Sequence, residues 1–375
     1  MITTARVAAA LACLGACGDT PSDTRAWVAP GIEITEPTPV LDDAGEVVAR
    51  GWARGPIMTY EREAVRPDLV DRVREWDFYA VHAPDVAIMI TLAEIRFAEV
   101  GSFVMASVSV HDLVTGERHA QAILLPDPDP MPGTVLDLAP VAGGAYAVSD
   151  GSGTMTYAGS AATRVLELAF GTDARLMGGR LELDAPAGES VALVTPWPQP
   201  GHFFYENKLL PMPARGFVTV GQRRWDLPAG ASWAAMDWVR AVVPETIEWT
   251  WAYGMGEVDG QRVGLNLGSV FGDESAGTPD AVIVDGRLHK LPASTWTTPE
   301  DPGAPWLFAS DDGRVDLALT PTNAYRETQR LDLGFYVSEL DKPYGAWSGR
   351  VTLEDGTELV VDGLIGAAER VHTVW

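Results

Sequence analysis

Turn-forming residues divide most of the chain into short segments, and their regular spacing constrains the fold more than any other feature of the sequence. Glycine, proline and Asp-Gly pairs recur at intervals of roughly 8–12 residues, with apolar or alternating segments between them, as in residues 180–184 (RLELD). No long segment has the 3.6-residue period of an amphipathic helix. The proline-rich stretches 126–133 and 196–201 cannot continue a strand ladder, because proline lacks an N–H donor. The pattern predicts an all-β fold, a sandwich or a barrel.

The length of 375 residues is enough for two domains. Each half contains an aromatic strand candidate followed by an apolar one, at 76–92 and 246–268. We therefore expect two β-barrels or curled antiparallel sheets in tandem that meet near residue 210. The predicted divisions are a lipoprotein signal peptide (1–16), a tether (17–44), an N-terminal barrel-like domain (45–210) and a C-terminal barrel-like domain (211–375).

The first residues have the features of an export signal. Arg6 precedes an apolar run from Val7 to Ala16, which is too short to span a bilayer. The run ends in Leu14-Gly15-Ala16-Cys17, which resembles a bacterial lipobox, and both cysteines of the chain, Cys13 and Cys17, lie here. We expect lipidation of Cys17 and anchoring to the bacterial cell envelope, on the outer membrane or the periplasmic face. An ordinary secretory leader is the alternative.

Composition excludes several functional classes. With 27 basic and 52 acidic residues the formal charge is −25, and such a surface repels phosphate backbones, so no nucleic-acid partner is expected. The six histidines are far apart and no cysteine lies beyond residue 17, so we predict no metal site and no cofactor. No nucleophile elbow or P-loop is present. The expected partners are a small apolar or amphipathic molecule and, through Cys17, a membrane.

The hairpin predicted over residues 246–268 is the best candidate for a ligand wall. Ile247, Trp249, Trp251 and Tyr253 are two residues apart, so their side chains share one face of a strand. The partner strand offers a face of Gly264, Asn266 and Gly268, which is nearly empty of side chains. The two strands could frame a cavity in the second barrel, although plain core packing is the alternative.

Polar residues in apolar surroundings are the candidates for chemistry. Asp237 and Arg240 lie in an apolar stretch, residues 233–243, that we interpret as a turn or short helix, where residues three apart share a face. Asn266 interrupts a strand, where asparagine is depleted, and a buried amide needs partners. Glu206 and Lys208 close an aromatic strand and could equally be an exposed pair. A structural ion pair is likewise the alternative for Asp237 and Arg240.

The chain carries an ordered set of motifs. They are Gly51-Trp52-Ala53-Arg54, Trp76-Asp77-Phe78-Tyr79, Tyr205-Glu206-Asn207-Lys208, Asp237-Trp238-Val239-Arg240, Gly264 to Gly268, Phe271-Gly272-Asp273, His289-Lys290-Leu291, Ser310 to Asp316, and Glu369, His372 and Trp375. Together they resemble a bacterial family known only as a domain of unknown function, number 2804. Here Ala241 follows the Asp-Trp-x-Arg motif, where family members usually have glycine, and Pro279-Asp280-Ala281 replaces a Glu-Asn-Ala. The resemblance extends from about residue 45 to the C-terminus and implies two tandem lipocalin-like (calycin) β-barrels or curled antiparallel sheets, similar to those of carotenoid hydratases.

The residues and the resemblance together give three functional hypotheses. The first is a lipid-anchored envelope protein that holds an apolar or amphipathic, lipid- or isoprenoid-like ligand in a barrel cavity. The second is a hydratase or isomerase with a buried carboxyl group as general acid. The third is a structural envelope protein whose own tryptophans fill its cavities. The candidate catalytic residues are Asp237, Asp273 and Glu206, and the candidate ligand-binding residues are Tyr205, Asn207, Trp238, Arg240, Trp249, Trp251, Asn266 and His289.

Overall fold

A computed structural model describes residues 29–97, 101–126, 145–160, 162–171, 176–185, 187–269 and 271–375. The predicted signal peptide and Cys17 lie outside these residues, as does the first part of the tether, residues 17–28. The described part is almost entirely β-structure, which confirms the all-β prediction. Within it, no helix is both long enough and apolar enough to cross a bilayer.

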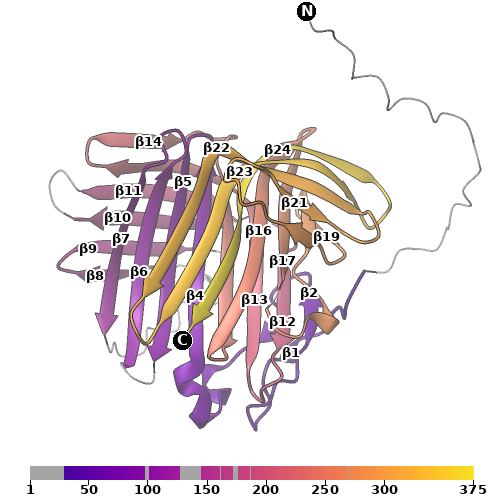
Figure 1. Ribbon diagram of the computed structural model, residues 1–375. Helices are drawn as coiled ribbons and strands as arrows, with labels where there is room; N and C mark the ends of the chain where they lie inside the picture. The colour runs from indigo at the N-terminus through magenta and orange to yellow at the C-terminus, as the bar shows by residue number, and fades with distance from the viewer. Residues whose placement is uncertain are drawn as a thin grey trace, which may run out of the picture.

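The first sheet has thirteen strands (Figure 1). Its main path runs β7-β6-β5-β4-β15-β13-β11-β10-β9-β8, and β12, β14 and β2 extend it beside β13. Its edge strands β7 and β8 approach each other, so the sheet is a nearly closed barrel. The strands are β2 (Gly51–Ala53), β4 (Val73–Ala83), β5 (Val86–Phe97), β6 (Gly101–Asp112), β7 (Arg118–Pro126), β8 (Ala145–Asp150), β9 (Gly153–Gly159), β10 (Thr163–Phe170), β11 (Met177–Asp184), β12 (Val191–Pro196), β13 (Phe203–Val220), β14 (Arg223–Leu227) and β15 (Trp233–Val242).

The second sheet has nine strands and curls into a half-barrel. Its order is β19-β18-β17-β16-β24-β23-β22-β21-β20, and every pairing is antiparallel. The strands are β16 (Thr246–Val258), β17 (Gln261–Ser269), β18 (Ala281–Val284), β19 (Arg287–Lys290), β20 (Thr295–Thr297), β21 (Trp306–Ala309), β22 (Val315–Asp332), β23 (Val337–Thr352) and β24 (Glu358–Val374).

Short elements surround the two sheets. Strands β1 (Thr38–Pro39) and β3 (Met58–Thr59) form a parallel pair. The 3₁₀ turns are η1 (Arg62–Ala64), η2 (Pro67–Arg72) and η4 (Glu274–Ala276). The chain turns as η2 only as far as Arg72 and then extends as β4.

Apolar side chains form three separate cores because both faces of the central strands are covered. The first core fills the first barrel and includes Tyr79, Tyr205 and Trp238. The second, the inter-sheet core, lies between the sheets and includes Trp251 and Tyr253. The third fills the half-barrel. The alternation of a strand sends neighbouring residues to different cores.

The change from one sheet to the other does not occur at the predicted boundary. Residue 210 lies within β13, which continues to Val220, and β14 and β15 also belong to the first sheet. The chain changes sheet at residues 243–245, between β15 and β16. The Pro-rich segment at 211–213 indicated a break in the chain, but the strand continues through it with an irregular register against β15.

The two sheets meet backbone to backbone at Gly264 on β17. A Cβ atom placed on Gly264 would lie 2.7 Å from the nitrogen of Pro211 on β13 and 2.8 Å from the carbonyl carbon of Leu210. A side chain at position 264 would therefore force the sheets apart. At Gly264, the glycine face predicted to frame a cavity lies instead against the backbone of the first sheet.

Candidate functional site

A cavity of about 290 Å³ lies between the two sheets, close to the C-terminal end of β24. Figure 1 shows the lower halves of β22, β23 and β24 in front of β4, β5 and β6, and residues of both groups line the cavity. We call it the aromatic lobe, since aromatic side chains make up much of its wall. They include Trp76, Phe78, Phe204, Trp249, Trp251 and Trp375.

The predicted location of the cavity, inside the second barrel, is corrected by this geometry. The half-barrel is filled by its own side chains, among them Trp306, Phe308 and Trp347, all at most 1 % exposed. The stripe Ile247, Trp249, Trp251 and Tyr253 does share one face of β16, as predicted, but that face points toward the first sheet. The ligand wall is therefore shared by both sheets.

Lys208 and Asp237 form a buried ion pair on the wall of the aromatic lobe. Lys208 Nζ lies 2.6 Å from Asp237 Oδ1 and 3.0 Å from Glu206 Oε2, and the side chain of Lys208 is 2 % exposed. Trp76 Nε1 donates a hydrogen bond of 3.2 Å to Asp237 Oδ2. The ammonium also lies 4.4 Å from the ring centre of Trp251, within range of a cation–π interaction. The cation is thus held between two carboxyl groups and an aromatic face.

Burial shifts the proton equilibria of this group. Burial raises the pKa of Glu206 to about 7, although the neighbouring Lys208 opposes the shift. Burial lowers the pKa of Lys208, but Asp237 and Glu206 outweigh that effect and the net change is upward. Near neutral pH Lys208 is therefore charged, whereas Glu206 holds its proton for much of the time. When Glu206 is protonated and uncharged, the charges of Lys208 and Asp237 balance each other.

Glu369 on β24 provides a second polar group on the lobe wall. Its Oε1 accepts a hydrogen bond of 3.0 Å from Trp249 Nε1, and its Oε2 lies 2.9 Å from Lys342 Nζ. Burial lowers the pKa of Lys342, but Glu369 outweighs burial and raises it above the usual range. Lys342 is therefore charged. Its ammonium lies 5.3 Å from the ring centre of Phe78.

A second hollow, of about 520 Å³, adjoins the first and shares Phe78, Thr91 and Glu369 with it. We call it the polar lobe. Its wall carries charged and hydroxyl groups from β5, β6, β7, β22 and β23, and the side chain of Arg118 at its rim is 37 % exposed. The six residues that characterise it are Ser107, Ser109, Arg118, Glu327, Lys342 and Tyr344.

Two neutral histidines lie behind the polar lobe. His111 Nε2 is 2.8 Å from Ser109 Oγ and His111 Nδ1 is 2.9 Å from Tyr325 Oη, while His82 Nε2 is 3.0 Å from Tyr253 Oη. Burial lowers the pKa of both histidines to about 3. They act here as hydrogen-bonding groups rather than as charges.

Three of the predicted site residues line the aromatic lobe: Asp237, Trp249 and Trp251. Asn266 lies directly behind them, since it accepts a hydrogen bond of 2.8 Å from Trp251 Nε1 and donates one of 2.9 Å to the carbonyl of Pro279. Asn266 therefore positions the indole of Trp251 and is itself fully buried. Glu206 contacts the lobe through Lys208.

The predicted pairing of Asp237 with Arg240 is wrong. Residues 233–242 form strand β15, not a helical turn, so residues three apart point to opposite faces. Asp237 faces the inter-sheet space and pairs with Lys208, whereas Arg240 faces the first barrel, 3.6 Å from Asp77. Burial raises the pKa of Asp77 to about 7 even though Arg240 opposes the shift.

Other predicted binding residues also belong to the interior of the first barrel. Tyr205 donates a hydrogen bond of 2.9 Å to the carbonyl of Met58 and packs edge-on against Trp238. Asn207 accepts a hydrogen bond of 2.7 Å from Ser190. On β13 these residues alternate with Glu206 and Lys208, so only the even-numbered residues of the motif reach the inter-sheet space.

Asp273 and His289 lie away from the cavity. Asp273 caps η4, accepting a hydrogen bond from the backbone of Ser275, and pairs with Arg50 at 2.7 Å with both side chains more than 40 % exposed. It is not the buried acid that was predicted. His289 lies on β19 near the edge of the second sheet and is not among the residues that line either lobe.

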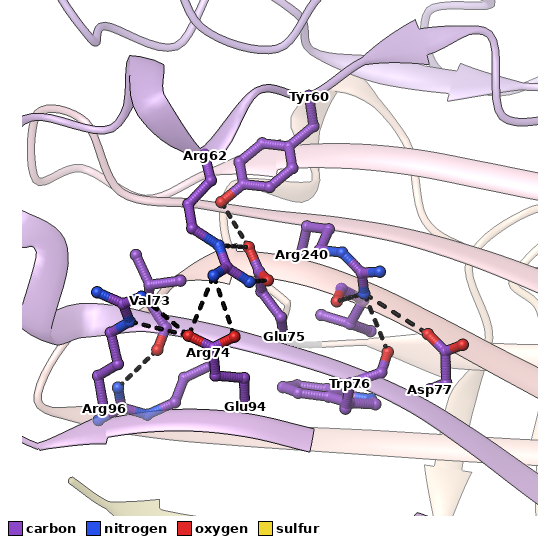
Figure 2. A network of polar contacts seen from close by, with 11 residues as sticks. Tyr60, Arg62, Val73, Arg74, Glu75, Trp76, Asp77, Glu94, Arg96 and Arg240 are labelled. Atoms are coloured by element: carbon purple, nitrogen blue, oxygen red, sulfur yellow. Dashed lines mark hydrogen bonds and ion pairs between the residues drawn. The ribbon is translucent and has the colours of Figure 1, made fainter. Parts of the chain in front are cut away.

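A different network of charges lies in the first barrel (Figure 2). Tyr60 and Arg62 contact Glu75, and Arg62 also pairs with Glu94, which Arg96 contacts from the other side. Glu75 and Glu94 are at most 3 % exposed. The Arg62 guanidinium thus bridges two buried carboxylates, and none of these groups lines the aromatic or the polar lobe.

Sequence reasoning missed the cations of the site. Lys208 was considered an exposed strand end, yet it is buried, and Lys342 lay in no motif. One signal was available for Lys208: it shares a strand face with Phe204 and Glu206, and a lysine in that company needs a partner when buried. No local signal identified Lys342. In the described residues, no cluster of three histidine, cysteine, aspartate or glutamate side chains could hold a metal ion.

The chain belongs to the family described as Domain of unknown function (DUF2804), whose model matches residues 31–375. No curated protein matches it. Among solved structures, it is similar to a candidate AttH protein from Nitrosomonas europaea, with 12 % identity, a TM-score of 0.40 and coverage of 81 % of this chain and 92 % of the other. It is also similar to kievitone hydratase from Nectria haematococca, with 14 % identity, a TM-score of 0.39 and coverage of 91 % and 97 %.

Proposed function

We propose that this protein binds an apolar or amphipathic small molecule between its two sheets, with the apolar part in the aromatic lobe. The observation that carries the proposal is a hollow with mainly apolar walls in which Lys208, Asp237 and Glu369 are the charged groups. Concave sites of this kind, with a few convergent polar groups, are typical of small-molecule binding. A purely structural role would not require a hollow beside buried charges.

The polar groups of the wall are already held in place before a ligand arrives. Lys208 is fixed by Asp237 and Glu206, and Glu369 by Trp249 and Lys342. Side chains fixed in advance lose little conformational freedom on binding, which favours affinity. A ligand hydroxyl or carbonyl group could therefore bond to Lys208 or Glu369 without rearrangement of the wall.

The proposal includes a cellular location. The lipobox-like sequence before Cys17 supports export and attachment to the cell envelope by a lipid anchor, which would place the cavity near a source of apolar molecules. Two or more acyl chains are needed for stable anchoring. Membrane fractionation of the full-length protein and of Cys17→Ala tests this part: the variant should become soluble with its fold intact. A wild-type mature N-terminus at any other residue would contradict it.

A second candidate function is acid–base chemistry on the bound molecule, such as hydration or isomerisation. The observation in its favour is Glu206, a buried carboxyl group whose pKa is raised to about 7, at 3.0 Å from the Lys208 ammonium that lines the cavity. A general acid with a pKa near the working pH is well suited to proton transfer. In this role Lys208 would give a proton to the ligand and would take a replacement proton from Glu206.

Mass spectrometry of molecules that co-purify with the native protein separates these functions. Binding alone predicts an apolar molecule retained unchanged by the wild type and retained less by Asp237→Asn, because the variant loses the anion that fixes Lys208. Catalysis predicts that substrate accumulates in Asp237→Asn while the wild type yields a hydrated or isomerised product.

Asp226→Asn is the matched control, since Asp226 on β14 is 69 % exposed and pairs only with Arg224 in the described part of the chain. If Asp237→Asn and Asp226→Asn both retain the same molecules as the wild type, the site assignment is wrong. An absence of any retained apolar molecule in wild-type extracts would count against the function itself.

A further inference from the structure

The aromatic and polar lobes are neighbouring hollows with a common wall. Phe78, Thr91, Met105, Leu340 and Glu369 line both of them. Thr91 on β5 belongs to this wall, and its cross-strand partner on β6 is Ser107, which lines the polar lobe. A ligand whose apolar part fills the aromatic lobe would reach the polar lobe by passing Thr91.

The floor of the polar lobe carries hydroxyl groups that are free to bond. Thr91 and Ser107 are cross-strand partners on the outer face of β5 and β6, and Ser109 lies two residues further along β6 on the same face. In the described part of the chain, the side chains of Thr91 and Ser107 form no hydrogen bond, and Ser109 bonds only to His111. Hydroxyl groups that can both donate and accept are suited to other hydroxyl groups.

The charges of the polar lobe are already neutralised in pairs. Arg118 Nε lies 3.0 Å from Glu327, and Lys342 lies 2.9 Å from Glu369, while the nearby His111 is neutral. Tyr344 Oη also donates a hydrogen bond of 2.6 Å to Glu327. An anionic or cationic head group would have to separate one of these pairs, which is unfavourable for groups removed from water. The lobe therefore favours a head group without charge.

A hydrolytic role for the same residues is disfavoured. Ser109, His111 and Glu327 follow the order of a nucleophile, a base and an acid, with 3.7 Å between His111 Nδ1 and Glu327 Oε2. However, β6 is paired on both sides, with β5 and with β7, so its backbone N–H groups are occupied by the sheet. A serine nucleophile there has no backbone oxyanion hole.

We propose, on the basis of the proposed function, that the ligand is an uncharged amphiphile with a hydroxylated head group, of the alkyl glycoside class. Its alkyl part lies in the aromatic lobe and its hydroxyl groups contact Thr91, Ser107 and Ser109 in the polar lobe. Specificity arises because these hydroxyl groups are left without partners when the head group is missing.

Three probes with the same ten-carbon chain test the proposal: decyl β-glucoside, decanol and decanoate, each below its aggregation concentration. Binding is measured by the change in tryptophan fluorescence, since Trp76, Trp249 and Trp251 line the aromatic lobe. The glucoside should bind about tenfold more tightly than decanol, and decanoate should bind most weakly. If decanoate binds as tightly as the glucoside, the proposal is overturned.

Variants locate the head group. Thr91→Val with Ser107→Ala, which preserves the volume of Thr91, should remove most of the preference for the glucoside, measured as the ratio of its affinity to that of decanol. Thr328→Val is the matched control, because Thr328 is exposed on the face of β22 opposite to Glu327. An unchanged preference in the double variant would overturn the proposal, and the wild-type comparison of probes still decides if that variant does not fold.

The same data separate this inference from the function on which it depends. Binding of decanol without any preference for the glucoside contradicts the head-group class but keeps the proposed cavity function. Failure of all three probes to bind contradicts both.

Discussion

Two buried groups of charges lie on opposite faces of β4 and its neighbours, and they differ in what surrounds them. In the first barrel, the Arg62 guanidinium joins Glu75 and Glu94, with Arg96 and Tyr60 as further partners (Figure 2). In the inter-sheet space, Lys208 joins Asp237 and Glu206, and the group borders a hollow.

The difference is informative about function. The barrel group is built around forked guanidinium groups, and its carboxylates have several partners each, which suits a structural connection between η1, β4 and β5. The inter-sheet group depends on one lysine, a compact charge with three donors, with an aromatic ring on its remaining side. A single cation beside an open space can exchange a protein partner for a ligand, whereas the barrel group has no such freedom.

Removal of the lysine should have the largest effect. Lys208→Met leaves Asp237 and Glu206 buried without their cation, and we expect the free energy of unfolding to fall by about 3–5 kcal/mol. Urea denaturation measures this loss. The addition of Asp237→Asn to the variant should recover part of it, because the carboxylate that has lost its cation is then replaced by a neutral amide. A loss below about 1 kcal/mol would show that the Lys208 ammonium is not needed to hold the inter-sheet group together, and would contradict the difference drawn between the two groups.

Truncation of Trp251 tests whether the inter-sheet group and the hollow form one site. The ring is 2 % exposed, stacks on Tyr253 at 4.5 Å and holds a hydrogen bond to Asn266. We expect Trp251→Ala to lower the free energy of unfolding by about 3 kcal/mol and to abolish binding of an apolar fluorescent probe. The buried Trp225 of the first core provides the control, since Trp225→Ala should reduce stability only. Equal probe binding in both variants would refute the aromatic lobe as the site.

The barrel group should respond less, and only in stability. Arg62→Met removes one cation, but Glu94 retains Arg96 and Glu75 retains the hydroxyl of Tyr60. We therefore expect a loss of about 2 kcal/mol in the free energy of unfolding, with ligand binding unchanged. Calorimetry and a binding titration of the same preparation check this. A variant that loses ligand at constant stability would assign a binding role to the barrel interior.

The smallest effect is a dependence on pH. The folded pKa of Glu206 is raised to about 7 from 4.5, so the folded state holds this proton over a window where the unfolded chain has released it. Its contribution to stability is complete below pH 4.5 and is lost as the pH rises through 7. The stability of the wild type relative to Glu206→Gln should fall across that window.

The pKa of Asp77 in the barrel is raised to about 7 from 3.8. The stability of the wild type relative to Asp77→Asn should therefore also fall as the pH rises through this window. If both differences stay flat between pH 4 and pH 7, the two carboxyl groups are ionised in the folded protein.

Local pattern was sufficient for the fold class but not for the way in which strands assemble. Alternation placed Trp249 and Trp251 on one face correctly, because the period of a strand is a property of the chain itself. The partner of that face depends on which sheet covers it, and contacts distant in sequence, such as Phe78 with Trp251 and His82 with Tyr253, decide that. The same limitation explains the boundary placed inside β13.

The error at Asp237 and Arg240 has a more specific origin. The segment from Trp233 to Val243 is apolar on both faces because β15 is covered on both, so its alternation is hidden and its period cannot be read. A continuous apolar run allows helix or strand. The helical reading brought Asp237 and Arg240 together, whereas the strand separates them and leaves Lys208, on the adjacent strand, opposite Asp237 in register.

The contact at Gly264 also determines how a molecule can enter. The backbones of β13 and β17 touch there, so the two sheets cannot move closer together at this point. A movement that separated the sheets would break this contact. Under the proposed function, a ligand would enter without separation of the sheets at this point, so the existing width of the space between them would limit its thickness.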